Sequence, residues 1–113
     1  IGRYKRQEDV SLRHVRAHVA SDRVLAEAGA VMGVEPDAFK VRRRHSPLRA
    51  IAARMLCKYA GLTQRDTART LGMNSGAAVS SQLQKLSALM AVDPKLSRQV
   101  AEIESRLDPM SRA

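Results

Sequence analysis

The chain has 113 residues and one cysteine, Cys57, which excludes an internal disulfide bond and favours a reducing, intracellular setting. No apolar run approaches the ~18 residues of a membrane span, and no signal-peptide pattern opens the chain, so we expect no membrane partner. A chain of this length fits one domain that buries roughly two thirds of its unfolded surface. Because it begins at Ile1 rather than Met, we expect a fragment of a longer protein.

The charge balance is strongly basic. Twenty Lys and Arg residues against eleven Asp and Glu residues give a net charge of +9. A stretch without any acidic residue carries seven of these cations, namely Lys40, Arg42, Arg43, Arg44, Arg49, Arg54 and Lys58. Such an excess on a small domain is typical of a phosphate-binding surface. The alternative is a solvated basic surface with no dedicated partner, which the long acid-free stretch disfavours.

The composition predicts an all-α fold, because Ala, Leu, Arg and Met are plentiful and β-branched runs are missing. We expect a compact helical bundle of about five to six helices. Residues 1–20 are expected to form a charged linker or helix, residues 21–108 the helical domain, and residues 109–113 a C-terminal tail.

The first clear helix is expected after a cap at Ser21, and Gly33 is expected to end it. Pro36 then begins a short helical turn, with Phe39 as its apolar anchor. The next helix opens at Ser46 and Pro47, a cap followed by proline at the first helical position. Its apolar residues recur at three and four positions and predict a central buried helix, namely Leu48, Ile51, Ala52, Met55, Leu56 and Tyr59. Its opposite face is expected to show Arg49, Arg54 and Lys58.

Three further helices are expected. Residues 63–66 form a capping box that opens a short helix, with Thr67, Ala68 and Leu71 pointing inward and Gly72 ending it. A second helix begins at Asn74 or Ser75 and turns its apolar positions inward, namely Val79, Leu83, Leu86 and Met90. The last helix begins with Asp93 as cap and Pro94 at the first position, and is expected to end at Pro109.

Residues 63–89 together predict a helix-turn-helix, in which the second helix enters the major groove of DNA. The motif needs a small residue where the helices touch, a turning residue and an apolar anchor, and Ala68, Gly72 and Val79 supply them. The outward face of the second helix is expected to carry Ser75, Gly76, Ala77, Ser80, Ser81, Gln84 and Lys85. The alternative is a Ser- and Ala-rich helix that packs against another helix.

Small side chains on that face allow close approach to the groove. Asn74 and Gln84 suit adenine, and Ala77 suits a thymine methyl group. No Arg lies on the base-facing turn, so phosphate contacts and DNA shape are expected to carry much of the affinity. The basic loop of Arg42, Arg43 and Arg44 is expected to reach a backbone or a minor groove, with Arg49 pointing the same way.

Residues 21–107 resemble a family, the C-terminal, Trp-repressor-like DNA-binding domain of the bacterial replication initiator DnaA. They are also similar to the DnaA-like domain at the C-terminus of some REP-associated, IS200-like transposases. The matching pieces are Gly-Val before Glu-Pro-Asp-Ala-Phe, Ser-Pro-Leu-Arg-Ala-Ile-Ala, Gly-Leu-Thr-Gln-Arg-Asp-Thr-Ala-Arg-Thr-Leu-Gly, Asn-Ser-Gly-Ala-Ala-Val and a closing helix opened by Asp-Pro. The Ser-Gly-Ala-Ala-Val form is closer to the transposase-associated version.

The resemblance implies binding to a specific sequence in double-stranded DNA. It makes Arg49 a minor-groove or phosphate arginine, and it brings Gln64 and Arg65, beside the cap Thr63, to the DNA. The base-reading positions match Ser75, Gly76, Ala77 and Ser80. The initiator carries Arg-Asp-His-Thr-Thr across residues 74–78, where this chain has Asn-Ser-Gly-Ala-Ala, which does not favour the initiator's own origin box. We expect a cytoplasmic, nucleoid-associated module, with a nuclease or transposase domain upstream in the full-length protein.

Catalytic signals are weak, and we expect no enzyme activity, metal or cofactor. No Walker A pattern is present. His14 and His18 have helical spacing but no third ligand nearby, and Cys57 lies among apolar positions typical of a small core residue. Two other functions remain open. The chain could bind RNA or single strands, which scarce aromatic residues disfavour, or it could be a helical interaction domain whose basic face binds an acidic protein or membrane surface.

Overall fold

The computed structural model describes residues 17–42 and 46–111. Within these two ranges the chain forms five α-helices and one short 3-10 helix, and no strand. The helices are α2 (Ser21–Met32), η1 (Pro36–Lys40), α3 (Leu48–Tyr59), α4 (Gln64–Leu71), α5 (Gly76–Val92) and α6 (Pro94–Ser111). The all-α fold that the composition predicts is confirmed. None of these helices combines the length and apolar character needed to cross a bilayer.

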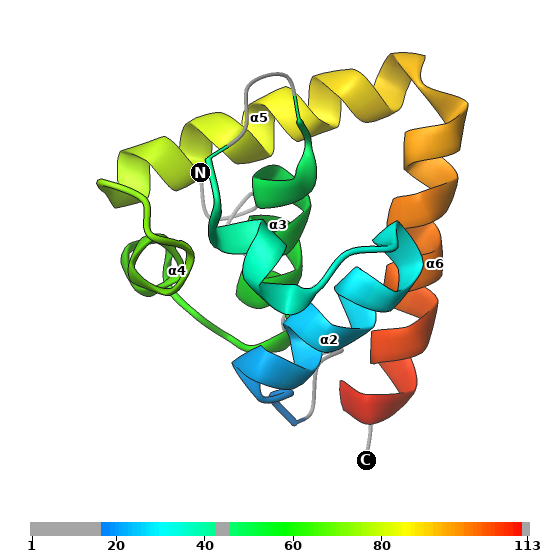
Figure 1. Cartoon of the computed structure of the whole chain (residues 1–113), viewed down its shortest axis with the longest axis horizontal. Coiled ribbons are helices and arrows are strands. Elements are labelled where there is room, and N and C mark those ends of the chain that lie inside the picture. Colours follow the sequence, from blue (N-terminus) through cyan, green and yellow to red (C-terminus); the bar gives the residue numbers. More distant parts are fainter. Residues whose placement is uncertain (1–16, 43–45, 112–113) are drawn as a thin grey trace, which may run out of the picture.

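Helix α3 lies at the centre, and α2, α4, α5 and α6 all pack against it (Figure 1). Small side chains let neighbouring helices approach it closely, since Ala50, Ala52 and Ala53 are all buried. The expected core positions Ile51 and Met55 are fully buried as well. The predicted central helix is therefore confirmed.

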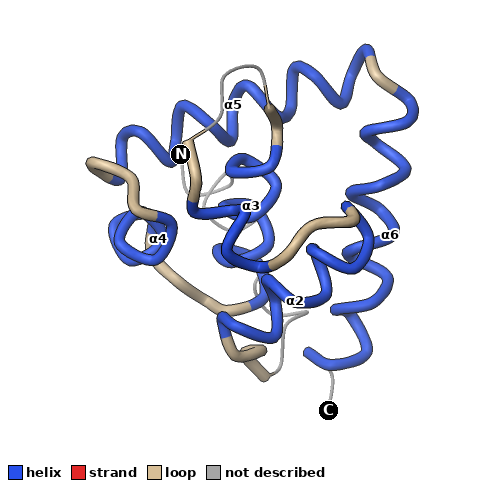
Figure 2. The backbone as a smooth tube through the Cα atoms, in the orientation of Figure 1, coloured by secondary structure: helices blue, strands red, loops and turns tan. Residues whose placement is uncertain are grey.

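The remaining helices pack around α3 on different sides. Helix α5 runs along one edge of the molecule from α4 to α6, which lie on opposite sides of α3 (Figures 1 and 2). Helix α2 packs on α3 and α6, and the short helix η1 packs on α2 and α3 through the buried Phe39. Because of this layout, α4 and the beginning of α5 form one end of the molecule.

Several predicted helix starts are confirmed by their capping bonds. The Thr63 hydroxyl accepts the Asp66 N–H at 3.1 Å, and the Asp93 carboxylate accepts the Leu96 N–H at 3.1 Å. Of the two residues proposed to start α5, Ser75 is the cap. Each bond satisfies a backbone donor that a helix start leaves unpaired.

Three boundaries differ from the sequence-based expectation. Ser21 is the first residue of α2 rather than its cap, and no side chain caps that helix. The Ser46 hydroxyl does accept the Leu48 N–H at 3.3 Å, but Pro47 precedes α3 instead of beginning it.

The third difference concerns Pro109, which was expected to end the last helix but lies inside α6. The helix continues to Ser111, whose carbonyl accepts the Ala17 N–H at 2.8 Å and whose side chain is buried. The proline removes a single helical hydrogen bond close to the end, and packing of Leu107 and Ser111 offsets that loss. The predicted boundary at residue 109 therefore falls inside a helix.

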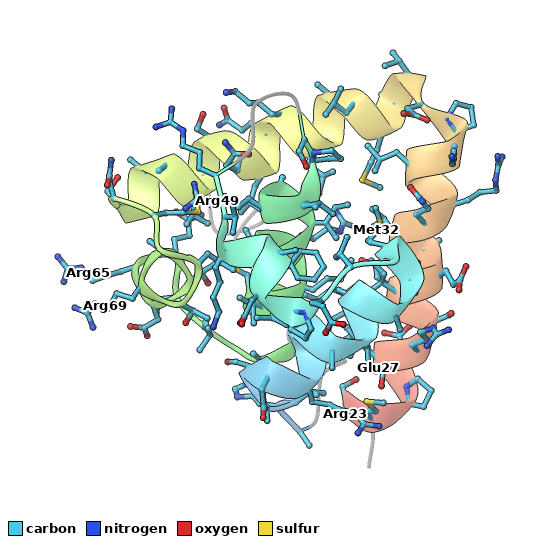
Figure 3. The ribbon with its side chains drawn as sticks, viewed as in Figure 1. Arg23, Glu27, Met32, Arg49, Arg65 and Arg69 are labelled. Atoms are coloured by element: carbon cyan, nitrogen blue, oxygen red, sulfur yellow. The ribbon has the colours of Figure 1, made fainter. Side chains whose placement is uncertain are left out.

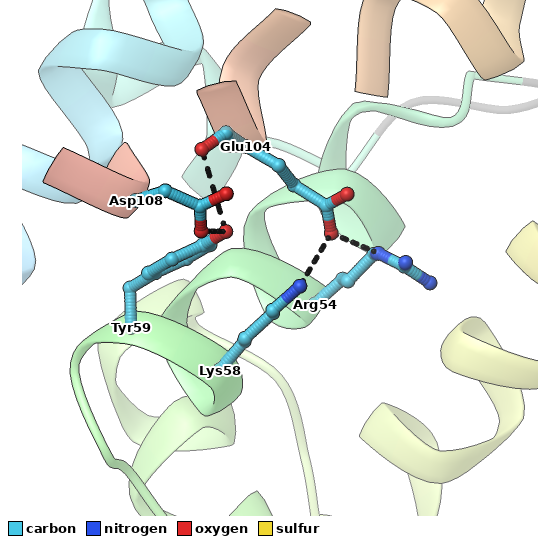
Figure 4. Close-up of polar contacts among 5 residues, drawn as sticks. All are labelled: Arg54, Lys58, Tyr59, Glu104 and Asp108. Carbon is cyan, nitrogen blue, oxygen red and sulfur yellow. Dashed lines mark hydrogen bonds and ion pairs between the residues drawn. The ribbon is translucent and has the colours of Figure 1, made fainter. Parts of the chain in front are cut away.

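Polar contacts tie α3 to α6 (Figure 4). The Glu104 carboxylate binds Arg54 Nε at 3.1 Å and Lys58 Nζ at 3.3 Å. The Tyr59 hydroxyl donates to Asp108 Oδ1 at 2.5 Å. Arg54 and Lys58 lie off the buried face of α3, as the spacing predicts, but both are half-buried and paired with an acidic side chain of α6.

Burial raises the pKa of Tyr59 above its ordinary value of 10.0, and the hydrogen bond to Asp108 raises it further. Above about pH 10 the unfolded chain loses this proton while the folded chain keeps it. The free energy of unfolding should therefore fall with rising pH, by about 1.4 kcal/mol per pH unit for this one proton.

We expect the Tyr59→Phe variant to lack this alkaline loss, although it will be less stable at neutral pH because Asp108 loses its donor. Urea unfolding of both proteins at about pH 9, 10.5 and 11.5 measures the two slopes. Equal slopes would contradict the assignment of a protonated Tyr59 to the folded state.

Candidate nucleic-acid interface

The link between α4 and α5 begins with a sharp reversal at Gly72, whose φ of 69° is in the left-handed region. The Met73 N–H donates to the Ala68 carbonyl at 2.7 Å, and the Gly72 N–H to the Arg69 carbonyl at 3.4 Å. This pair of bonds is the Schellman arrangement that ends many helices. Residues 72–75 then connect directly to α5.

The two helices pack together through their inward faces. Thr67, Ala68 and Leu71 of α4 are buried, as are Val79 and Leu86 of α5. These are the positions that the sequence predicts to point inward. Leu83 and Met90 are only partly buried but pack against the same core. The geometry is thus two packed helices joined by a short turn.

The outer face of α5 carries no charge over its first turns. Ala77, Ser81 and Gln84 are exposed, followed by the exposed Lys85. Ser80 is half-buried. The Ser75 hydroxyl is already engaged, because it accepts the Ala78 N–H at 3.2 Å. Asn74, in the link, is exposed.

Gly76 was expected on this outer face, and it is half-buried against the start of α4. A Cβ atom at Gly76 would lie 3.4 Å from the Arg65 backbone nitrogen and 3.5 Å from Gln64 Cβ. Gly76 therefore lies against the start of α4, so the two helix starts are close together. The unpaired N–H groups and positive dipole ends of both helices consequently lie side by side.

Two arginines project from α4 away from the rest of the molecule, Arg65 and Arg69 (Figure 3). Both are exposed, together with Thr63 and Gln64 at the start of the helix. Arg69 Nη1 lies 3.7 Å from Asp66 Oδ1, a loose contact on a surface where ion pairs contribute little. Arg69 was not among the expected site residues. Its position four residues after Arg65, which places both on one helix face, was the signal available.

The expected basic loop is described only in part. Arg42 is exposed, while Arg43 and Arg44 lie outside the described residues. The segment before Arg42 is close to the α4–α5 link, since a Cβ atom at Gly72 would lie 3.8 Å from the Lys40 carbonyl oxygen. The loop therefore leaves η1 beside the turn that connects α4 to α5.

Arg49 is half-buried, and its side chain binds the end of α4 on the side where the basic loop leaves η1. Its Nη2 atom donates to the Leu71 carbonyl at 3.0 Å and to the Gly72 carbonyl at 2.9 Å. Figure 3 shows Arg49 beside α4. The side chain is drawn inward because the last carbonyls of α4 are unpaired and carry the negative end of the helix dipole.

Two acidic residues, one on α2 and one on α6, each bind two cations. Glu27 of α2 binds both Arg23 at 3.2 Å and Arg106 at 3.4 Å, and Glu104 binds two cations of α3. Arg23 and Arg106 on the α2–α6 side are thus paired with carboxylates. Exposed cations outside these ion pairs include Arg65 of α4 and Arg42 after η1, as well as Lys85, Lys95 and Arg98 of α5 and α6.

Cysteine and histidine side chains are the other reactive groups to consider in the part of the chain that the structure describes. Cys57 is half-buried, and its sulfur lies 3.3 Å from the Thr67 hydroxyl oxygen. His18 is exposed, and His14 lies outside the described residues. In residues 17–42 and 46–111, no three His, Cys, Asp or Glu side chains gather closely enough to hold a metal ion.

Comparisons of the chain with protein families, with curated proteins and with solved structures found no match.

The position of Gly76 predicts a steric effect that its exposed neighbour lacks. In Gly76→Leu, Cβ meets the start of α4 at ordinary contact distance and the atoms beyond it crowd Gln64 and Arg65, so we expect a loss of about 1–3 kcal/mol in the free energy of unfolding. In Ala77→Leu the side chain enters solvent, and we expect a change within about 0.5 kcal/mol. Urea denaturation followed by circular dichroism compares the two. A stable Gly76→Leu protein would contradict the close contact between the two helix starts.

Proposed function

We propose that the chain is a non-enzymatic module that binds a specific sequence in double-stranded DNA, with α4 and α5 as a helix-turn-helix. The observation that carries this proposal is the pairing of an uncharged, exposed start of α5 with the cationic outer face of α4. A duplex needs both features from a partner. The major groove, about 12 Å wide, admits a helix with small side chains, and the flanking phosphates attract cations.

In this proposal the start of α5 enters the groove. The exposed Ala77 suits a thymine methyl group, and the exposed amides of Asn74 and Gln84 suit adenine. Gly76 contributes through its backbone, while the exposed Ser75 hydroxyl, which accepts the Ala78 N–H, keeps its own O–H to donate to DNA. The adjacent starts of α4 and α5 favour a phosphate between them.

In this proposal the cations of α4 contact DNA phosphates and so set the position of the module on the duplex. Arg65 and Arg69 lie one turn apart on the same exposed face, a spacing that lets both reach one strand of the backbone. Arg42 adds a cation on the neighbouring loop. The resemblance to the DnaA-like domain of transposases supports this arrangement, and we propose a nuclease or transposase domain as its covalent partner in the full-length protein.

The structure also bears on the two competing functions. Single-strand and RNA binders commonly stack bases on exposed aromatic side chains. The two aromatic residues within the described part of the chain, Phe39 and Tyr59, are both fully buried. An acidic protein partner would bind the same cations, and a pull-down with nuclease present would retain such a partner but lose one bridged by nucleic acid.

Fluorescence anisotropy of a labelled random duplex of about 30 base pairs, at low and moderate salt, tests the proposal directly. We expect binding that weakens with salt and is competed by duplex more than by single-stranded DNA or RNA. No binding at low salt, or stronger competition by single strands, would contradict it.

Arg65→Ala should weaken binding to every duplex, because it removes a phosphate contact. The slope of log affinity against log salt should become shallower by about one unit. Arg98→Ala is the matched control, since Arg98 is also an exposed arginine but lies on α6, on the other side of α3. An equal loss in both variants would indicate a general effect of net charge rather than a contact at α4.

Ala77→Asp should reduce duplex binding by at least about tenfold, because it places a carboxylate against the bases and phosphates. Ala88→Asp is the control, an exposed alanine on the same helix about three turns further along. Both variants should retain helical circular dichroism. Unchanged affinity in a folded Ala77→Asp protein would mean that α5 does not enter the groove.

A further inference from the structure

Arg49 occupies the point where three parts of the molecule meet. It belongs to the first turn of α3, and its Nη2 atom reaches the final carbonyls of α4 at Leu71 and Gly72. The Lys40 carbonyl oxygen, at the end of η1, would lie 3.8 Å from a Cβ atom on Gly72, and so would Arg49 Nη2. The central helix, the end of α4 and the approach to the basic loop therefore converge at this one side chain.

The bonds at Arg49 complete the termination of α4. The Schellman bonds satisfy the carbonyls of Ala68 and Arg69, but they leave those of Leu71 and Gly72 without a backbone partner. The guanidinium group supplies charged donors to both. Its Nε atom is buried and finds no partner among the described residues. The side chain as a whole is half-buried, but a buried polar atom without a partner calls for an explanation, and a role in positioning the link supplies one.

The link that Arg49 holds is the one that orients α5. Residues 72–75 are the whole connection between α4 and α5, and the backbone at Gly72 sets the direction in which the chain leaves α4. By fixing the Gly72 carbonyl to α3, Arg49 fixes that direction relative to the core.

From these contacts we infer that Arg49 is a positioning residue, which holds α5 at the angle needed for sequence-specific reading of the duplex and does not itself contact DNA. This inference rests on the proposed function. It differs from the role that the resemblance implies for Arg49, a direct contact with the minor groove or a phosphate. A side chain whose Nη2 already binds two carbonyls must give up both bonds before that group can reach DNA.

The test compares Arg49→Met with Arg54→Met in the full chain. Both variants remove one positive charge from α3, and each breaks a contact to another helix, α4 in one case and α6 in the other. Binding is measured against a duplex selected from a random library and a scrambled duplex of the same composition, over a range of salt. Circular dichroism first establishes a temperature at which both variants are folded.

For a positioning role, Arg49→Met should lose roughly tenfold affinity for the selected duplex relative to Arg54→Met. Its affinity for the scrambled duplex and its salt slope should match those of Arg54→Met. Arg49→Lys should restore binding only in part, because lysine keeps the charge but carries it one bond short of Nη2. A slope shallower by about one unit, with equal losses on both duplexes and full rescue by lysine, would show a phosphate contact and overturn the inference.

Amide hydrogen exchange tests the positioning without DNA. The Met73 N–H, bonded to the Ala68 carbonyl, should exchange faster in Arg49→Met than in Arg54→Met, because the link loses its tie to α3. Equal exchange at Met73 would also overturn the inference. If the unaltered chain binds no duplex, the proposed function fails instead, and the exchange result still reports whether Arg49 holds the link.

Discussion

The fold depends on finding hydrogen-bond and ion-pair partners for the polar side chains of α3, a helix that other helices surround on nearly every side. The α3 helix has seven buried residues among its twelve, so the polar groups on it have few directions in which to find partners. At its start Arg49 binds the end of α4, and at its end Arg54, Lys58 and Tyr59 bind α6. The same helix therefore provides both the apolar surface that gathers the others and the polar ties that orient them.

Features set by neighbouring residues could be predicted from the sequence. The period of the apolar positions in residues 48–59 identified the buried helix, and the caps at Thr63 and Asp93 fixed two helix starts. Gly72 ends α4 as expected because glycine adopts the left-handed backbone easily. All of these depend on interactions over a few residues, which a sequence displays directly.

Features set by distant partners could not be predicted. Arg49 meets a carbonyl 22 positions away, and Arg54 meets a carboxylate 50 positions away, so neither contact leaves a local pattern. The direction of Gly76 depends on how closely α4 approaches α5. Pro109 is tolerated because the chain near Ala17 packs on the end of α6. In each case a tertiary contact overrides what the residue type alone favours.

The hydrogen bond between Ala17 and Ser111 has a topological consequence. It brings the two ends of the described chain together at the end of the molecule farthest from α5 (Figure 1). Two positions this close suit a circular permutation in which a short linker joins residue 111 directly to residue 17 and new ends open in an exposed loop elsewhere. This end of the molecule also suits attachment to a surface or to a fusion partner, because a tether there leaves α4 and the start of α5 unobstructed.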